Sequence, residues 1–278
     1  MTGKLKEKTG NIICHLYLII LSVIAAFPLI WVLLCSVKSS GDLTSNPTSI
    51  LPKEFTLDHF RNVIETLGFA RNIGNSLIIA FFTTLIAIAV SSLAAYGIVR
   101  FFPKFGNIMS RALVTTYMFP PILLAIPYTL VMAKLGLTNT RTGLVIVYLS
   151  FSVPYAVWML IGFFKTVPIG IEEAARVDGA NKMVTFVRIV LPLVAPGIVA
   201  TAIYTFINAW NEFLYSLILI NSTELMTVSV ALRSLQGAEI LDWGSMMAAS
   251  TLVVIPSVVF FMFIQKYIAG GMTEGSVK

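Results

Sequence analysis

Six long apolar stretches constrain this chain more than any other feature of its sequence. A helix needs about 20 residues to cross the hydrocarbon core of a bilayer, and soluble domains contain few apolar runs of that length. The 278 residues are 57% hydrophobic and only 12% charged, which is too little charge to cover a water-exposed surface. We therefore predict an all-α integral membrane protein with six transmembrane helices, near Leu16–Ser36, Ile73–Val99, Met109–Met132, Gly143–Phe164, Pro196–Ile220 and Trp243–Tyr267.

The same composition argues against several classes of protein. So few charges disfavour a soluble enzyme, a disordered protein and a nucleic-acid binder, and the formal charge of +6 fits the basic cytoplasmic loops of a membrane protein. The two cysteines, Cys14 and Cys35, would lie about 31 Å apart along one helix, too far for a disulfide within the chain. The sequence predicts no metal site, no cofactor of its own and no nucleic-acid partner.

Charges in the loops predict the orientation of the chain. Of the 19 Lys and Arg residues, 12 fall at the two ends of the chain and in the loops near 100–108 and 165–195, when Arg111 is counted with the first of these loops. Basic loops stay in the cytoplasm, so both termini are expected on the cytoplasmic side of the membrane. We expect a cytoplasmic N-terminal segment at 1–15, one transmembrane domain at 16–267 and a cytoplasmic tail at 268–278. The first span is too long for a signal peptide and is expected to be retained.

The outer loop near 37–72 is the longest loop and carries a short amphipathic pattern. Two interpretations of this pattern stay open, a helix that lies on the membrane surface and a loop that packs against the protein. The apolar positions of the pattern are Phe55, Leu57, Phe60, Val63, Ile64 and Leu67.

The loop between the fourth and fifth spans carries the most specific pattern in the chain. Glu172 and Glu173 fall near the start of a predicted helix, where the positive end of the helix dipole favours acidic residues. Two alanines follow and keep one face of the helix narrow, and Gly179 can end the helix in a left-handed conformation after Asp178. The sequence thus predicts a short helix-turn-helix whose narrow face could dock into a groove of another protein.

This loop resembles the EAA loop of importer-type ABC permeases. Its pattern, E-A-A-x3-G-x9-I-x-L-P, is formed by Glu173, Ala174, Ala175, Gly179, Ile189, Leu191 and Pro192. The segments AARVDGA, LGLTNTRTGL, WNEFL and DWGSMMAAS and the tail GGMTEGSVK resemble the carbohydrate-uptake branch of that family, in particular the six-span G-type permeases of maltose importers. The resemblance extends from about residue 70 to the end, which implies a permease core at 70–267 with the EAA loop at 165–195.

The resemblance implies a transport component that works with several partners. In that family the EAA helix is a coupling helix, which docks on a cytoplasmic dimer of ATPase subunits that binds ATP and Mg²⁺. The implied coupling residues are those of the motif together with Glu172 and Asp178. The other implied partners are a second permease subunit, an extracellular carbohydrate-binding protein and a sugar or oligosaccharide. The second permease is expected to be a different chain, in a heterodimer, and a homodimer is the alternative. The implied location is the cytoplasmic membrane of a bacterium or archaeon. The tail Gly270–Lys278 is expected, on the same resemblance, to reach along the ATPase dimer.

The chain carries no signature of an enzyme. No phosphate-binding loop of the form G-x4-G-K-[ST] occurs in it. The only histidines, His15 and His59, are expected to be structural or solvated rather than catalytic. We therefore predict that the chain does not hydrolyse ATP itself and that a partner ATPase supplies the energy.

Polar residues of the fifth span are predicted to line a translocation path or the interface with the second permease. They recur at steps of three or four and would share one face of a continuous helix. Glu212 is the only acidic residue in any predicted span, and a carboxylate exposed to lipid is costly. A hydrogen-bonded seam that serves only packing is the alternative. The stripe consists of Thr201, Thr205, Asn208, Glu212 and Ser216, with Tyr204 and Asn211 beside it.

The third span contains Pro120, Pro121 and Pro127, which are expected to break its regular helix. Tyr117 and Tyr128 of this span could stack on sugar rings. A kinked packing helix with interfacial tyrosines is an equal alternative, because transporters of many kinds contain broken helices.

Other functions stay open on the sequence alone. An ion-coupled secondary transporter would use Glu212 as its ion site and would act without an ATPase, and a membrane scaffold would transport nothing. Within the family, a permease for a non-sugar solute such as a polyol or glycerol phosphate is the alternative.

Overall fold

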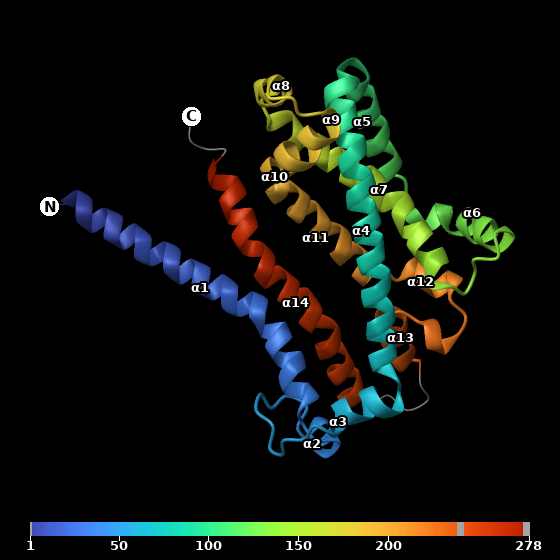
Figure 1. Ribbon diagram of the computed structural model, residues 1–278. Coiled ribbons are helices and arrows are strands. Elements are labelled where there is room, and N and C mark those ends of the chain that lie inside the picture. Colours follow the sequence, from blue (N-terminus) through green and yellow to red (C-terminus); the bar gives the residue numbers. More distant parts are fainter. Residues whose placement is uncertain (1, 238–241, 275–278) are drawn as a thin grey trace. The chain divides into compact units, whose positions relative to one another are not determined.

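The computed structural model describes the backbone of residues 2–237 and 242–274, and the side chains of 10–237 and 242–262 except 103, 105 and 107. Within these residues the chain is helical and contains no strand, which confirms the predicted all-α fold (Figure 1). The helical elements are α1 (Thr2–Ser36), α2 (Ser40–Ser45), α3 (Asp58–Arg61), η1 (Asn62–Thr66), α4 (Phe69–Phe101), α5 (Pro103–Tyr117), α6 (Pro121–Lys134), α7 (Arg141–Thr166), α8 (Ile169–Val177), α9 (Lys182–Val184), η2 (Thr185–Val190), α10 (Leu191–Leu193), α11 (Ala195–Asn211), α12 (Leu214–Leu219), η3 (Thr223–Leu225), α13 (Val228–Leu235) and α14 (Trp243–Glu274).

Four of these helices are long and apolar enough to cross a bilayer. They are α1, α4, α7 and α14, and they correspond to the first, second, fourth and sixth predicted spans. Two bent helix pairs could each supply one more, so the described residues hold four to six candidate spans. The α14 helix continues to Glu274, so the first part of the predicted tail is helical, and residues 275–278 lie outside the described residues.

The third predicted span is broken at its prolines. The helices α5 and α6 meet at an angle of 89°, and Pro120 between them is extended with ψ 122°. Proline lacks the amide hydrogen that would continue a helix, and it disfavours a helical conformation in the residue before it. The expected break therefore occurs at Pro120 and Pro121, whereas Pro127 lies inside α6 without ending it.

The fifth predicted span, Pro196–Ile220, is wrong as a single helix. The α11 helix ends at Asn211, Glu212 is extended with φ −64° and ψ 130°, and α12 begins at Leu214. At its other end, α11 meets the helical run Lys182–Leu193 at an angle of 77°. The hydrogen bonds of the Glu212 carboxylate, described below, stabilise the break before α12.

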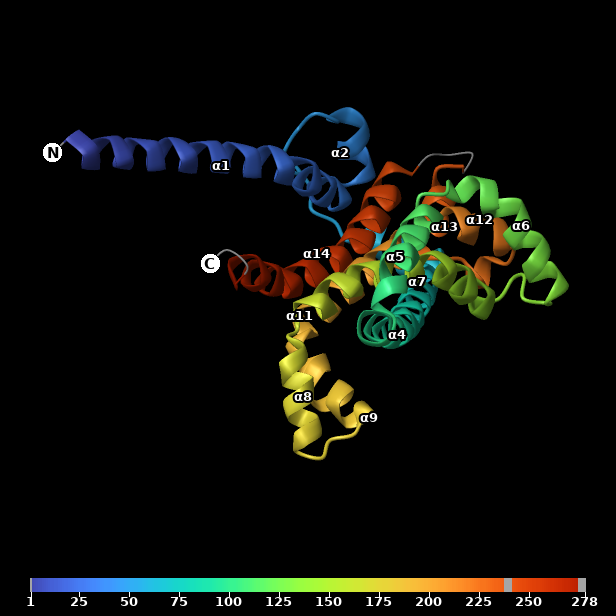
Figure 2. The ribbon, with the colours of Figure 1, turned by 90° about the horizontal axis from the view of Figure 1, so that it is seen from above.

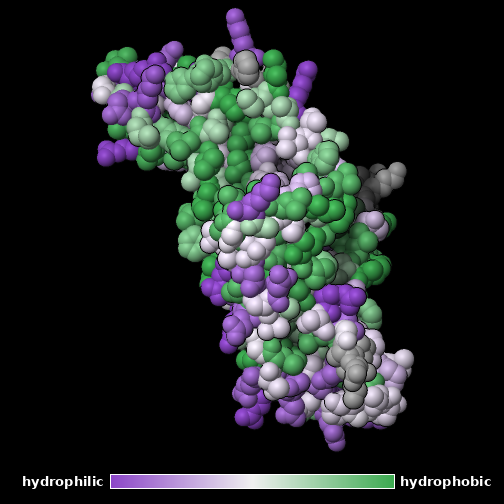
Figure 3. Space-filling model, turned by 90° about the vertical axis from the view of Figure 1, so that its right-hand side faces the viewer, coloured by the Kyte–Doolittle hydropathy of each residue, from purple (hydrophilic) through white to green (hydrophobic). Residues whose placement is uncertain are grey.

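The chain forms two compact units, one of residues 1–69 and 232–255 and one of residues 70–231 and 256–278. In the first unit, only 6% of the most apolar part of α1 is buried. Hydrophobic residues also cover much of the exposed helical surface on the side drawn in Figure 3. Such exposure is expected for helices whose solvent is lipid.

In the first unit, the segment that follows α1 packs around Lys38 and His59. The Lys38 side chain is fully buried, and its ammonium group donates a hydrogen bond to the Ser49 carbonyl oxygen. The ring nitrogen Nε2 of His59 lies 2.9 Å from the Lys38 carbonyl oxygen. The same ring packs against Gly244 so closely that a Cβ at residue 244 would lie 2.0 Å from His59 Cε1. His59 therefore serves packing.

The interpretation as a packed loop holds for part of the amphipathic pattern, and contact with a membrane surface stays a prediction. Val63 of η1 is fully buried, as a packed loop requires. Phe55 and Leu57 precede α3 and are exposed, with fractions of 69% and 59%.

Asp242 stabilises the start of α14. Its carboxylate accepts hydrogen bonds from the Ser245 amide (3.1 Å) and hydroxyl (2.5 Å), and it lies 4.0 Å from His59 Nδ1. Burial raises the pKa of Asp242, but the hydrogen bonds from Ser245 and the nearby imidazole outweigh burial and hold the pKa below its ordinary value. Because the pKa is lowered in the folded protein, the charged carboxylate stabilises the folded state at pH values above about 4, the pKa of aspartate in an unfolded chain.

We expect Asp242→Ala to lower the free energy of unfolding by about 1 kcal/mol near neutral pH, the usual effect of removing a helix N-cap. The difference between wild type and variant should disappear as the pH falls through the folded pKa, below about pH 4. Thermal unfolding of the detergent-solubilised proteins over a pH series measures this. A difference that does not change with pH would contradict the role of the charged carboxylate.

The second unit is organised around α7, which packs against α5 and α11. One end of the unit has an aromatic and aliphatic core that joins α4, α7 and η2, with Tyr96, Phe164 and Phe186 at its centre. The short helices α8 and α9 lie together at that end (Figure 1, Figure 2).

Candidate functional site

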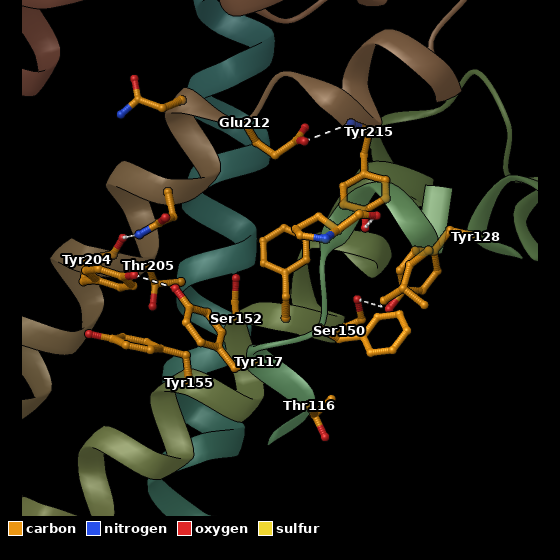
Figure 4. Close-up of a pocket in the computed structure, with 16 residues that line it drawn as sticks. Thr116, Tyr117, Tyr128, Ser150, Ser152, Tyr155, Tyr204, Thr205, Glu212 and Tyr215 are labelled. Atoms are coloured by element: carbon orange, nitrogen blue, oxygen red, sulfur yellow. Dashed lines mark hydrogen bonds between the residues drawn. The ribbon is translucent and has the colours of Figure 1, made fainter. Parts of the chain in front are cut away.

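A cavity of about 470 Å³ lies within the second unit, where α6, α7, α11 and α12 meet near the end of α5 (Figure 4). Its wall combines five tyrosines with hydroxyl and amide side chains. The residues that line it are Thr116, Tyr117, Phe119, Pro121, Leu124, Tyr128, Ser150, Phe151, Ser152, Tyr155, Tyr204, Thr205, Asn208, Asn211, Glu212 and Tyr215.

Three tyrosines from three helices form one side of the cavity. The rings of Tyr155 and Tyr204 stack with their centres 4.0 Å apart, and those of Tyr117 and Tyr155 lie 5.3 Å apart. The hydroxyls of Tyr117 and Tyr204 lie 2.7 Å from each other in a hydrogen bond (Figure 4). Because α5, α7 and α11 each contribute one ring, this aromatic group connects the three helices.

The opposite side of the cavity holds two further tyrosines in fixed positions. Tyr128 donates a hydrogen bond to Ser150 Oγ (2.6 Å), and Tyr215 donates one to the carbonyl oxygen of Pro121 (2.8 Å). The Tyr215 ring also stacks on Phe151, with ring centres 5.9 Å apart. Aromatic faces next to hydroxyl and amide groups can hold a ligand that has apolar ring faces and polar edges.

Glu212 lies at the cavity, but its carboxylate is already engaged. It accepts hydrogen bonds from the Tyr148 hydroxyl (2.5 Å), the Tyr215 amide (2.8 Å) and the Ser216 amide (3.2 Å). Both amides belong to the first turn of α12, where the unpaired N–H groups and the helix dipole favour a carboxylate. Glu212 therefore caps α12 and links it to α7.

The predicted polar stripe of the fifth span is only partly realised. Thr205, Asn208 and Glu212 reach the cavity, together with the flanking Tyr204 and Asn211. Thr201 is buried and bonds back to the carbonyl of Gly197 in its own helix. Ser216 is fully buried, hydrogen-bonds to Thr227 at 2.7 Å, and does not line the cavity, because the break at Glu212 removes it from the helical face of α11.

Several residues that complete the cavity were not predicted from the sequence. Tyr155 and Ser152 of α7 face it, and Tyr215 closes one side. The aromatic residues Tyr148, Phe151 and Tyr155 recur at steps of three and four along α7, and this pattern could have marked the inward face of the helix.

The loop with the EAA pattern forms α8, which begins after Pro168 and ends before Asp178. Gly179 has φ +84°, a left-handed conformation that glycine adopts without strain, and the Ala180 amide bonds back to the Ala175 carbonyl at 2.9 Å. The predicted glycine turn is therefore confirmed. The chain then continues through α9, η2 and α10 toward α11.

The residues predicted to couple to an ATPase fall into two groups. Exposed ones are Glu173, Ala174, Asp178, Gly179 and Pro192, whereas Ile189 and Leu191 are half-buried and Ala175 and Glu172 are buried. Glu172 is 2% exposed and points inward, so it does not belong to the outer face of α8. Its partners are Tyr96 and Arg100, which sequence analysis did not single out.

No group of three or more His, Cys, Asp or Glu side chains within the described part of the chain could hold a metal ion. His15 is exposed, and its ring nitrogen Nδ1 lies 2.6 Å from the carbonyl oxygen of Asn11 in the same helix. Cys14 is exposed and Cys35 is buried, and both are free.

Comparison with known proteins identifies the family. Residues 87–274 match the family described as binding-protein-dependent transport system inner membrane component. The trehalose/maltose transport system permease protein MalG of Thermococcus litoralis is 34% identical over 98% of this chain and 99% of its own length. A putative ABC transporter permease protein of Streptomyces antibioticus, ORF1, is 38% identical over 82% of this chain and its own full length.

A solved structure has the same fold. The chain resembles one in the crystal structure of a bacterial ABC transporter involved in the import of the acidic polysaccharide alginate, with a TM-score of 0.78. The similarity covers 94% of this chain and 97% of that chain, at 21% sequence identity. The family match and the similarity to the MalG relative show that the chain is a multi-pass membrane subunit, a transport component and not an enzyme. This chain thus belongs to the inner-membrane permease family of binding-protein-dependent ABC transporters.

Proposed function

We propose that this chain is one of two permease subunits through which an ATP-driven importer moves an uncharged sugar or oligosaccharide into the cell. The observation that carries the proposal is the aromatic and polar cavity between α7 and α11. A pyranose ring presents C–H groups on its faces and hydroxyls at its edge, which complement stacked tyrosines beside amides and hydroxyls. The name of the Thermococcus litoralis relative, a trehalose/maltose permease, supports the same substrate class.

The charge of the cavity favours an uncharged substrate. Among the described residues that line it, none is Lys, Arg or His, and the only carboxylic acid is Glu212. A carboxylate or phosphate on the substrate would meet this acid without a cation from this chain to offset the repulsion. A neutral carbohydrate therefore fits this half of the path better than an acidic polysaccharide or glycerol phosphate does.

The exposed face of α8 supports docking on a cytoplasmic ATPase dimer, which would bind ATP and Mg²⁺. Glu173, Ala174 and Arg176 are exposed there, next to Val177, whose side chain is 89% exposed. Both termini belong in the cytoplasm in this proposal, because the distribution of basic residues among the loops favours that orientation. A second permease forms the other half of the path, and an extracellular binding protein delivers the sugar.

Ion-coupled transport through Glu212 is less well supported, because its carboxylate already accepts three hydrogen bonds from protein groups.

The proposal is tested by co-expressing the chain with the ATPase, second permease and binding protein encoded near it, and by reconstituting the purified complex into liposomes. We expect uptake of neutral oligosaccharides that requires ATP and the binding protein. Uptake by this chain alone, driven by a proton or sodium gradient, would overturn the proposal in favour of secondary transport.

Tyr204 tests whether the cavity contacts the sugar. We expect Tyr204→Leu, which removes the ring from the aromatic group, to lower the uptake rate about tenfold at saturating binding protein, corresponding to roughly 1.4 kcal/mol. Tyr204→Phe keeps the ring and removes only the hydroxyl, so a smaller loss is expected. Tyr17→Leu on the exposed surface of α1 is the control. Equal uptake by Tyr204→Leu and wild type would mean that the sugar does not use this cavity.

A further inference from the structure

A buried ion pair attaches α8 to the end of α4. The Glu172 side chain is 3% exposed and that of Arg100 is 10% exposed. The guanidinium Nε of Arg100 donates to Glu172 Oε1, and the Tyr96 hydroxyl donates to Glu172 Oε2 at 2.7 Å. Both carboxylate oxygens are therefore used, and each bonds to a residue of α4.

The same arginine also holds the end of α7. Arg100 Nη2 donates to the carbonyl oxygen of Val167 at 2.8 Å, and Val167 is the C-cap residue that directly follows α7. Arg100 lies in the last turn of α4, where the negative end of the helix dipole favours a cation, and Glu172 lies in the first turn of α8, where the positive end favours an acid. One pair of side chains thus joins the ends of three helices.

Apolar contacts surround this ion pair and extend the attachment to η2. The Tyr96 ring lies 4.8 Å from Phe186 of η2 and 5.8 Å from Phe164 of α7, measured between ring centres. The Lys182 ammonium of α9 lies 4.8 Å from the ring centre of Phe101, at the end of α4. The loop between α7 and α11 therefore contacts α4 through α8 and also through α9 and η2.

We propose that Arg100 and Glu172 are positioning residues that make α8 move as one rigid block with the cytoplasmic ends of α4 and α7. This inference rests on the proposed docking of α8 on an ATPase. The function of the pair would then be mechanical. When the ATPase displaces α8, the displacement passes to the transmembrane helices instead of being absorbed by flexing of the loop.

Loss of one partner should uncouple ATP hydrolysis from transport. Glu172→Gln removes the charge but keeps the shape of the side chain, and it leaves a buried guanidinium without its counterion, a strongly unfavourable change. In the reconstituted importer we expect ATP hydrolysis to continue while the amount of sugar moved per ATP falls about tenfold. The control is Glu65→Gln, which breaks the exposed ion pair of Glu65 with Arg61, where the two side chains are 62% and 75% exposed. Exposed pairs contribute little, so this control should transport normally.

A distance measurement tests the rigid block directly. Spin labels on cysteines at Phe102, beside the end of α4, and at Val177, at the end of α8, report the separation of the two elements; both sites are exposed. The native cysteines are first replaced by serine. In otherwise wild-type importer we expect the same narrow distance distribution without nucleotide and after trapping with ATP and vanadate. Glu172→Gln should broaden it. A wild-type distance that changes on trapping, or a narrow distribution with normal uptake in Glu172→Gln, would overturn the proposal.

A double variant keeps the test decisive if Glu172→Gln fails to assemble. Replacing both members of a buried pair by apolar residues of similar size is often tolerated, so Arg100→Met with Glu172→Leu should restore assembly, the narrow distribution and most of the uptake. A double variant that has the narrow distance distribution but does not recover uptake would contradict a positioning role. Failure of the proposed function itself would be seen separately, because the wild-type chain would then not co-purify with any ATPase.

Discussion

Replacing Glu212 by leucine is expected to lower the free energy of unfolding by about 3 kcal/mol or more and to abolish sugar uptake. The substitution leaves the amides of Tyr215 and Ser216 uncapped and the hydroxyl of the fully buried Tyr148 without its acceptor. Each buried polar group left unpaired costs roughly 1–3 kcal/mol. The measurements are thermal unfolding of the purified subunit in detergent and uptake by the reconstituted importer.

Glu212→Gln is the matched control for this variant. The glutamine keeps an oxygen that can accept from the helix amides, so a smaller loss of stability and partial uptake are expected. If Glu212 faced lipid, leucine would be neutral or stabilising, because a carboxylate in lipid costs on the order of 2.5–3.5 kcal/mol. An ion-coupled transporter would instead lose its activity with glutamine alone, in the absence of any ATPase. A more stable leucine variant would refute the capping role.

Gly197→Leu is expected to prevent α11 from packing against α7 and to leave little folded subunit in the membrane. Gly197 is buried, and the Phe163 ring of α7 lies so close that a Cβ at residue 197 would be 2.2 Å from Phe163 Cγ. No rotamer of leucine removes that contact, so the helices must separate, at a cost of about 3 kcal/mol or more. Since α11 and α7 carry half of the residues that line the cavity, uptake should be lost together with stability.

Two variants identify the cause of this effect. Gly162→Ala changes the residue beside Phe163, at a position where a Cβ meets nothing within 4 Å, and should be neutral or slightly stabilising in its helix. Gly197→Ala introduces the clashing Cβ alone, and combining it with Phe163→Ala should recover part of the lost stability, because the ring that blocks the Cβ is gone. The measurement is thermal unfolding in detergent. No recovery in the double variant would exclude the Phe163 contact as the cause.

Features set by neighbouring residues could be predicted from the sequence. The break between α5 and α6 follows from Pro120 and Pro121, and the turn after α8 follows from Gly179, because each depends on the backbone of the residue itself. The long apolar helices were equally predictable, since length and hydropathy are local properties.

Features stabilised by distant partners could not be predicted in this way. No proline or glycine lies between Gly197 and Gly237, so the sequence gives no local reason for the helix to break at Glu212. The break depends on a hydrogen bond from Tyr148, 64 residues earlier. Likewise, Arg100 counted only as one more basic residue of a cytoplasmic loop, whereas its partner Glu172 lies 72 residues further along the chain. Both pairs become visible only when packing brings the helices together.

The π-helical segment η2 changes how positions in the EAA pattern should be counted. Within it the Leu191 amide bonds to the Phe186 carbonyl, five residues earlier, and Pro192 follows with no amide hydrogen to offer. A helical wheel drawn at about 100° per residue accumulates an angular offset across this wider turn. The nine residues between Gly179 and Ile189 therefore fix the direction in which the side chain of Ile189 points, as well as its distance from Gly179 along the chain. Deleting one of them would point Ile189 and Leu191 in a new direction, so a loop transplanted between transporters must keep this phase to present the same face.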